Sequence, residues 1–273
     1  TTGSNNTAMG EGSLSANTTA SNNTAVGRYA LNENVTGTEN TAMGLSALRV
    51  NTASYNSAFG KSALEVNTTG QYNAAFGAYS LDGNTTGDYN TAIGTYALGD
   101  QTTGGSNTAL GFKALKYNTT ASNNVAVGYE ALHVNTTGTA NVAVGYKALD
   151  ANTTASNNTA IGNGALGLNT TGAQLVAVGN GALEANTTGN YNIALEKNTT
   201  GANNVAVGLQ ALEDNTTGNN NTALGFAASN GRTAGNDNVA VGAYCMNAAA
   251  TGDSNTGLGK SALHDLTSGA TNT

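Results

Sequence analysis

The stretch Asn124-Val-Ala-Val-Gly-Tyr-Glu-Ala-Leu-His-Val-Asn-Thr-Thr-Gly-Thr-Ala140 is one complete copy of a seventeen-residue phrase that fills the chain. Its consensus, N-T-A-V-G-x-x-A-L-x-x-N-T-T-G-x-x, recurs about sixteen times in 273 residues, with one spacing shortened to 16 and one to 12. A short, strict period is typical of a solenoid, in which each repeat buries its apolar side only by stacking on its neighbours. We therefore expect a single repeat domain over residues 1–273.

Within one copy, the pattern predicts two short strands and two turns. Asn-Thr-Ala-Val-Gly forms the first strand, and the Ala-Leu pair forms a second strand whose leucine points into the coil. The fifth-position glycine is expected at a corner with positive φ, or where stacked backbones leave no room for a Cβ. Asn-Thr-Thr-Gly makes the other corner, and stacking places its asparagines in a ladder, Asn17, Asn34, Asn51, Asn67 and Asn84. The fold class is all-β, a parallel β-solenoid in the form of a two-sided β-roll, and about sixteen 17-residue coils give a rod about 75 Å long.

Two regions depart from the consensus. Between Asn192 and Asn204 five residues covering the Gly corner are missing, so the roll must pinch or kink there. The repeats over 230–273 are degenerate, as expected near a cap or a junction to another module. Thr1-Thr2-Gly3 is the tail of a repeat and Asn272-Thr273 opens one, so we expect more polypeptide, or a second copy docked head to tail, at each end.

The first strand is apolar on both faces, and a thin roll covers only one of them. The constant alanine suits the narrow interior, which leaves the large fourth-position residues for contact between chains; the opposite assignment stays open because Thr also occurs at position two. A stripe running along a rod favours parallel, side-by-side homo-oligomers. The stripe comprises Val26, Phe59, Phe76, Ile93, Val127, Val144, Ile161, Val178, Val207 and Val241.

The phrases Asn141–Gly145, Asn124–Gly128, Asn204–Gly208 and Asn238–Gly242 resemble the S-V-A-I-G repeats in the heads of YadA-like trimeric autotransporter adhesins. The longer N-T-T-G-x-x-N-T-A-x-G phrase is similar to repeat regions of bacterial surface and phage tail-fibre proteins. The resemblance implies a left-handed parallel β-roll, three chains side by side, and display on a cell surface. It rests on one short motif and carries no individual binding residue.

Composition excludes several function classes. A net charge of −7 with nine Lys and Arg leaves no basic stripe for nucleic acid. No apolar run is long enough to insert in a membrane. His133 and His264 lie far apart in the stack, and no carboxylate pair, nucleophile, P-loop lysine or calcium-binding nonapeptide is present, so we expect no catalysis, no cofactor and no metal.

Eleven asparagines stand in N-x-T sequons on one corner. They either serve the turn and the ladder, matching the sequon by accident, or carry a glycan stripe on a secreted filament. The candidate acceptors are Asn17, Asn34, Asn67, Asn84, Asn118, Asn135, Asn152, Asn169, Asn186, Asn198 and Asn215.

The sequence thus favours a structural and adhesive fibre or adhesin head, extracellular, on a cell surface or in a virion fibre. Such a rod gives reach and multivalent contact with a surface, matrix or carbohydrate ligand. The alternatives are a solenoid whose Thr ladders bind ice or another surface, and a phage tail-fibre shaft. The tyrosines at variable positions, such as Tyr29, Tyr79, Tyr96, Tyr129 and Tyr146, are expected to make lateral contacts or to stack on carbohydrate.

Overall fold

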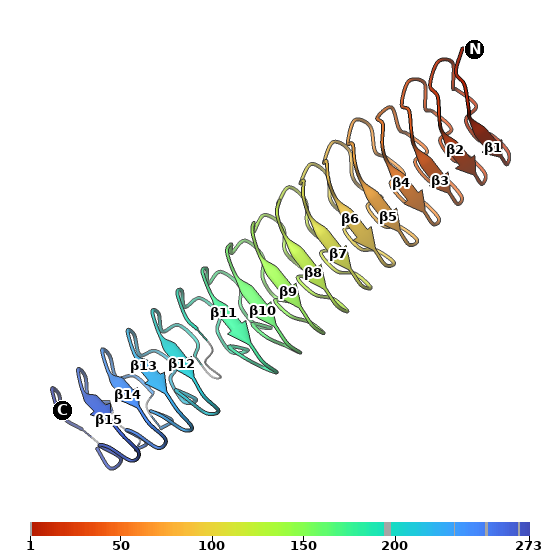
Figure 1. Ribbon diagram of the computed structural model, residues 1–273. Helices are drawn as coiled ribbons and strands as arrows, with labels where there is room; N and C mark the ends of the chain where they lie inside the picture. Colours follow the sequence, from red (N-terminus) through yellow and green to blue (C-terminus); the bar gives the residue numbers. More distant parts are fainter. Residues whose placement is uncertain (1, 194–197, 232, 249–250, 267) are drawn as a thin grey trace. The chain divides into compact units, whose positions relative to one another are not determined.

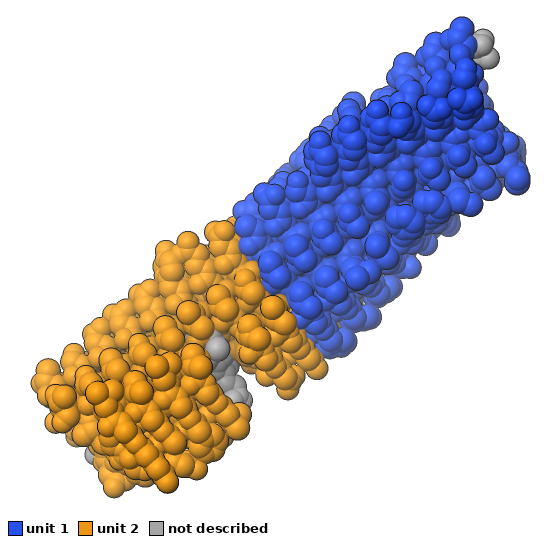
Figure 2. Space-filling view, in the orientation of Figure 1, with its two compact units in different colours: residues 1–146 blue, residues 147–273 orange. Residues whose placement is uncertain are grey.

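Two compact units make up the structure, residues 1–146 and residues 147–273 (Figure 2). The computed structural model describes residues 2–193, 198–231, 233–248, 251–266 and 268–273. The shortened coil at 192–204 and the degenerate repeats at 230–273 both belong to the second unit, with residues 194–197, 232, 249–250 and 267 outside the described part.

The first unit is a stack of parallel three-residue strands, one in each repeat (Figure 1). Each strand pairs in register with the strand of the next repeat, so that alanine lies opposite alanine along the stack. The strands are β1 (Thr7–Met9), β2 (Thr24–Val26), β3 (Thr41–Met43), β4 (Ser57–Phe59), β5 (Ala74–Phe76), β6 (Thr91–Ile93), β7 (Thr108–Leu110), β8 (Val125–Val127) and β9 (Val142–Val144).

The second unit repeats this arrangement. Its strands are β10 (Thr159–Ile161), β11 (Val176–Val178), β12 (Val205–Val207), β13 (Thr222–Leu224), β14 (Val239–Val241) and β15 (Thr256–Leu258). β10 pairs with β11, β12 to β15 form a four-stranded parallel sheet, and Ile193 makes a single bridge to Val176 on one side and to Val205 on the other. The predicted all-β, parallel β-solenoid with a 17-residue repeat is confirmed.

Small and aliphatic side chains fill the interior of each coil. In the coil of β2, Ala25, Ala30 and Leu31 are fully buried, whereas Thr24 and Val26, on either side of Ala25, are half-buried. Because side chains alternate along a strand, the alanine faces inward and the second and fourth positions face outward. This is the favoured assignment from the sequence, and the opposite assignment, with the large residues inside, is wrong. Each buried leucine stabilises the coil by about 2 kcal/mol.

The predicted second strand at the Ala-Leu pair is wrong, because this side of the coil is a run of turns. Tyr29 and Leu31 have φ values of 59° and 48°, which an extended strand does not contain. The N–H groups of Tyr29 and Leu31 bond to opposite neighbours. The Tyr29 N–H donates to the Glu11 carbonyl of the previous coil at 2.9 Å, and the Leu31 N–H donates to the Ala47 carbonyl of the next coil at 3.1 Å. These inter-coil bonds and the burial of leucine offset the strain of the left-handed residues.

The fifth-position glycine is required for both reasons predicted from the sequence. Gly128 has a φ of 140°, a region that L-residues with a Cβ rarely adopt. A Cβ on Gly128 would also meet the backbone of Gly145 in the next coil, with its carbonyl carbon only 2.7 Å away. The corner glycines therefore stack backbone on backbone.

Candidate interaction surfaces

The fourth-position stripe forms an outward apolar row on the strands of each unit. None of the ten predicted stripe residues is buried. Those classed as exposed are Phe76, Ile93, Ile161, Val178 and Val207, and those half-buried are Val26, Phe59, Val127, Val144 and Val241. Neighbouring members contact each other along the row, as the stacked Phe59 and Phe76 rings do at 4.6 Å between centroids. The stripe thus offers a continuous apolar strip along β1 to β9 of the first unit and a shorter one along β12 to β15 of the second.

Two asparagine ladders meet inside the coil at the Asn-Thr-Thr-Gly corner. Asn67 Nδ2 donates to Asn51 Oδ1 of the previous coil and to the Gly70 carbonyl, both at 2.8 Å. Asn56 Nδ2 donates to the same Gly70 carbonyl at 2.8 Å, and Asn56 Oδ1 accepts from the Asn73 backbone N–H at 3.0 Å. All four asparagines are buried. The predicted ladder is confirmed, and its amides find partners in the coils on both sides.

One rung of this ladder holds Gln101 in place of asparagine. Its Nε2 donates to the Gly104 carbonyl at 2.7 Å, and its Oε1 accepts from Asn118 Nδ2 and Asn107 Nδ2, each at 3.0 Å. Asn84 Oδ1, in the coil before, is buried and has no hydrogen-bond partner within the described residues. In a regular rung the amide of the following coil donates to this atom, so the ladder is broken here.

The sequon asparagines are therefore part of the coil interior. Asn17, near the chain start, is half-buried and the other ten are buried. In all eleven, Nδ2, the atom that would carry a glycan, donates to the backbone carbonyl three residues further on. This geometry supports the interpretation that these residues serve the turn and the ladder, and glycosylation stays a prediction that a folded coil disfavours.

The two threonines of the corner have different environments. The first is half-buried in most coils, and its hydroxyl donates to the threonine carbonyl of the next coil, as Thr68 Oγ1 does to Thr85 at 2.9 Å. The second, such as Thr69 or Thr86, is exposed. The corner thus presents a single row of outward threonines in place of two adjacent rows.

Tyrosines at equivalent positions in consecutive coils stack into ladders. Tyr55, Tyr72 and Tyr89 are 44%, 47% and 61% exposed, and their rings lie nearly parallel with centroids 5.0 and 5.1 Å apart. Two further ladders are Tyr79–Tyr96 and Phe112–Tyr129–Tyr146. Stacking covers the ring faces and leaves the edges and hydroxyls outward, so only an end ring offers a face to a carbohydrate. The recurrence of Tyr at 17-residue spacing is the sequence signal for these ladders.

Charged side chains lie on the turn side of the coils. Arg49 makes ion pairs with Glu33 at 2.8 Å and Glu65 at 3.0 Å, in the coils before and after. Burial, and then the nearby Asp100 carboxylate, raise the pKa of Asp82 to about 6. A short ladder of alternating charge therefore joins three consecutive coils of the first unit, from Glu33 to Glu65.

The two histidines lie in different units. The His133 ring lies 5.0 Å from that of Tyr117, and His264 Nδ1 lies 2.7 Å from Asp265 Oδ1 at the surface.

Comparison with protein-family models, with curated proteins and with solved structures finds no match for this chain. In the described part of the chain, no helix has the length and apolar character to cross a membrane. Function must therefore be inferred from the surfaces described above.

Proposed function

We propose that the chain is a segment of an extracellular structural and adhesive fibre, in which copies associate side by side through the fourth-position stripe. The observation that carries this proposal is the outward apolar row on consecutive strands of each unit. Monomeric proteins rarely leave an apolar patch of this extent uncovered. A row of identical positions also suits a partner with the same repeat, since a copy in parallel presents the same spacing.

The size of the stripe favours an extended contact. Covering the exposed half of one valine, isoleucine or phenylalanine gains about 1 kcal/mol. A large apolar residue, which is Met or Leu on β1, β3 and β7, stands at this position on each of β1 to β9, so covering the row gains at most about 9 kcal/mol for the first unit. Association costs about 4–15 kcal/mol in lost translational and rotational freedom. Contact over two or three coils would not suffice, whereas a parallel contact along many coils would.

A closed trimer is the arrangement we favour, because a cyclic assembly covers the stripe of every copy. It agrees with the resemblance of the repeat to YadA-like adhesin heads and to phage tail-fibre repeats. On this proposal the outer surface, with its tyrosine edges and exposed threonines, contacts the host matrix, carbohydrate or another cell through many weak, repeated interactions. Catalysis, a cofactor and nucleic acid have no part in it.

The test is sedimentation equilibrium on the parent chain and on two doubly charged variants. Val127→Lys with Val144→Lys places two ammonium groups in the stripe, and Thr120→Lys with Thr137→Lys places two on the exposed corner of two adjacent coils, one of which also holds Val127. We expect the parent and the corner variant to sediment at a common multiple of 27.0 kDa, and the stripe variant as a monomer. A parent that is monomeric at micromolar concentration would refute the proposal.

The row of exposed threonines favours a second candidate, binding to ice or a mineral surface. It is the weaker one, because the hydroxyls of the first threonines are bonded to carbonyls and only one outward row is left. Thermal hysteresis in a solution of the chain, abolished by lysine at Thr120 and Thr137, would support it over the fibre.

A further inference from the structure

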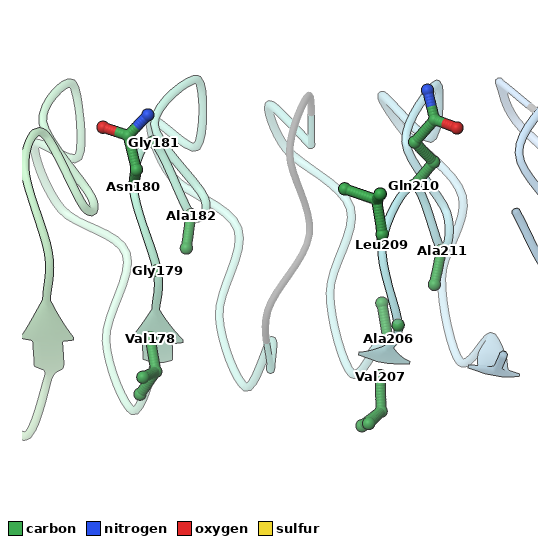
Figure 3. Close-up of a pocket in the computed structure, with 11 residues that line it drawn as sticks. Val178, Gly179, Asn180, Gly181, Ala182, Ala206, Val207, Leu209, Gln210 and Ala211 are labelled. Atoms are coloured by element: carbon green, nitrogen blue, oxygen red, sulfur yellow. The ribbon is translucent and has the colours of Figure 1, made fainter. Parts of the chain in front are cut away.

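Two rows of side chains face outward on the strands of each unit. The fourth-position stripe is one row, and the second-position residues, two places earlier in the same strands, are the other. On β5, Ala74 is half-buried and Phe76 is 40% exposed, while Ala75 between them is fully buried. Figure 3 shows two fourth-position residues of the second unit, Val178 and Val207, projecting from the same side of their coils. Each strand thus presents one second-position and one fourth-position side chain on a common face.

The sizes of the two outward side chains on a strand are inversely related. Where the second position is valine, the fourth is also valine, as on β8, β9, β11, β12 and β14. Where it is threonine, the fourth is the longer isoleucine, leucine or methionine, except for Val26 on β2. The smallest second-position residues, Ser57 and Ala74, stand beside the largest fourth-position residues, Phe59 and Phe76.

The two strand rows differ in this respect from the turn side of the coils. The sixth position of successive coils holds Glu11, Arg28, Leu45, Lys61 and Ala78, whereas neither strand row has a charged residue on any of β1 to β15. A side chain in water fills no defined volume, so solvent does not constrain the summed size of two neighbours. A packed surface does, because both voids and overfilling cost stability. The size relation therefore indicates that the strand face lies against a rigid surface.

A second copy of the chain, parallel and in register, carries the size profile that fits this face. When the fourth-position row of one copy lies on the second-position row of its neighbour, Phe59 meets the neighbour's Ser57 and Phe76 meets the neighbour's Ala74. Large side chains then face small ones at each level. Contact of like rows would set phenyl ring on phenyl ring in one row and leave voids in the other. The size relation therefore favours contact between unlike rows.

We propose that neighbouring copies pack in register, with the fourth-position row of one copy on the second-position row of the next. This inference rests on the proposed side-by-side association and specifies its geometry. Each copy gives its fourth-position row to one neighbour and its second-position row to the other, which is the heterologous contact of a closed ring. Residues outside the stripe thereby become contact residues, among them Thr24, Thr41, Ser57, Ala74, Thr91 and Val125.

The test measures self-association of the full chain and of two variants of nearly the same composition by sedimentation equilibrium. The row-exchange variant, with Ser57→Phe, Phe59→Ser, Ala74→Phe and Phe76→Ala, moves both phenyl rings to the second-position row. It keeps them on adjacent coils, as the stacked rings of the parent are. The level-split variant, with Ser57→Phe and Phe76→Ala, places both rings on β4 and none on β5.

We expect the row-exchange variant to associate with a Kd within about threefold of the parent value, because large still faces small at each level. The level-split variant should associate at least about tenfold more weakly, because β4 is overfilled and β5 is underfilled. At dilutions where all three chains are monomeric, the amides of Leu64 and Leu81, inside the two altered coils, should exchange at the parent rates. The altered positions face outward, so the fold itself is not perturbed.

Two results would overturn this packing. If the row-exchange variant associates as weakly as the level-split variant, like rows face one another. If the level-split variant associates as tightly as the parent, the sizes are not matched level by level. Either result leaves the side-by-side association standing when the parent sediments at a multiple of 27.0 kDa, whereas a monomeric parent refutes both proposals.

Discussion

Replacement of Gln101 by asparagine should stabilise the chain, because it repairs the break in the amide ladder. Asparagine at this rung would donate to Asn84 Oδ1, which is buried and has no partner within the described residues. It would keep the bond to the Gly104 carbonyl and still accept from Asn118, as Asn67 donates to the Gly70 carbonyl and accepts from Asn84 in its own rung.

The magnitude follows from the bonds gained and lost. A buried acceptor without a partner costs about 1–3 kcal/mol, and Gln101→Asn removes this cost. The substitution gives up the bond between Gln101 Oε1 and Asn107, which is worth about 1 kcal/mol, while Asn107 keeps its bond to the Ala121 carbonyl at 2.9 Å. The net gain is about 1 kcal/mol.

The reverse substitution, Asn67→Gln, is the matched control, because it breaks a regular rung with the same pair of residues. Asn51 Oδ1 would lose its 2.8 Å bond, and we expect a loss of about 1 kcal/mol. Since a solenoid can open coil by coil, the assay is amide exchange at the strands next to the altered rung, with urea unfolding as a second measure. Destabilisation by Gln101→Asn, or no effect from either substitution, would refute the ladder as a source of stability.

Three further outcomes are expected. Gly128→Val should lower the free energy of unfolding by about 3 kcal/mol or more, because the valine would have a strained φ and would collide with Gly145. Gly164→Asn is the control: its φ of 65° is one at which other coils carry side chains, so thermal melting should be nearly unchanged. The raised pKa of Asp82, about 6 against about 3.9 when unfolded, means that the folded state holds the proton more tightly, so stability falls as pH rises from about 4 to about 6. Asp82→Asn should remove this pH dependence. It should also raise the free energy of unfolding at pH 7.5 by only about 1 kcal/mol in denaturant unfolding, because Asp82 is half-buried and partly screened by solvent. An unchanged pH dependence in the variant would contradict the assignment to Asp82. Intact mass of chain secreted from a eukaryotic host should not change on enzymatic removal of N-glycans, and a loss of several sugar masses would show that the sequons are used.

Much of the fold could be predicted from the repeat. Because identical residues stack at one position in every coil, the period alone places Ala25 on Ala42 and Asn67 on Asn51. The same regularity explains the fifth-position glycine and the buried leucine, because each of them packs between the equivalent residues of the coils before and after. Strand alternation placed the second and fourth positions on one face, and the small size of the alanine favoured that face as the outward one.

The tertiary structure alone decided how the turn side is built. Ala30 and Leu31 look like a strand in sequence, but the positive φ of Leu31 lets its N–H reach Ala47 in the next coil. The turn conformation of Leu31 depends on a hydrogen-bond acceptor in the next coil, and the local propensities of Ala30 and Leu31 carry no information about that acceptor. The sequon asparagines are a second case. Their place in a turn could be predicted from the local sequence, whereas their burial results from the coils stacked on either side.

The shortened repeat at 192–204 shows the division between sequence and structure. The sequence determined that five residues are missing between Asn192 and Asn204. The tertiary structure decided that the asparagine side stays continuous there, because Asn198 donates to Asn186 Oδ1 and the Asn204 N–H donates to Asn192 Oδ1. Because these hydrogen bonds fix the rung spacing on the asparagine side, the amide ladder continues across a coil that is five residues short.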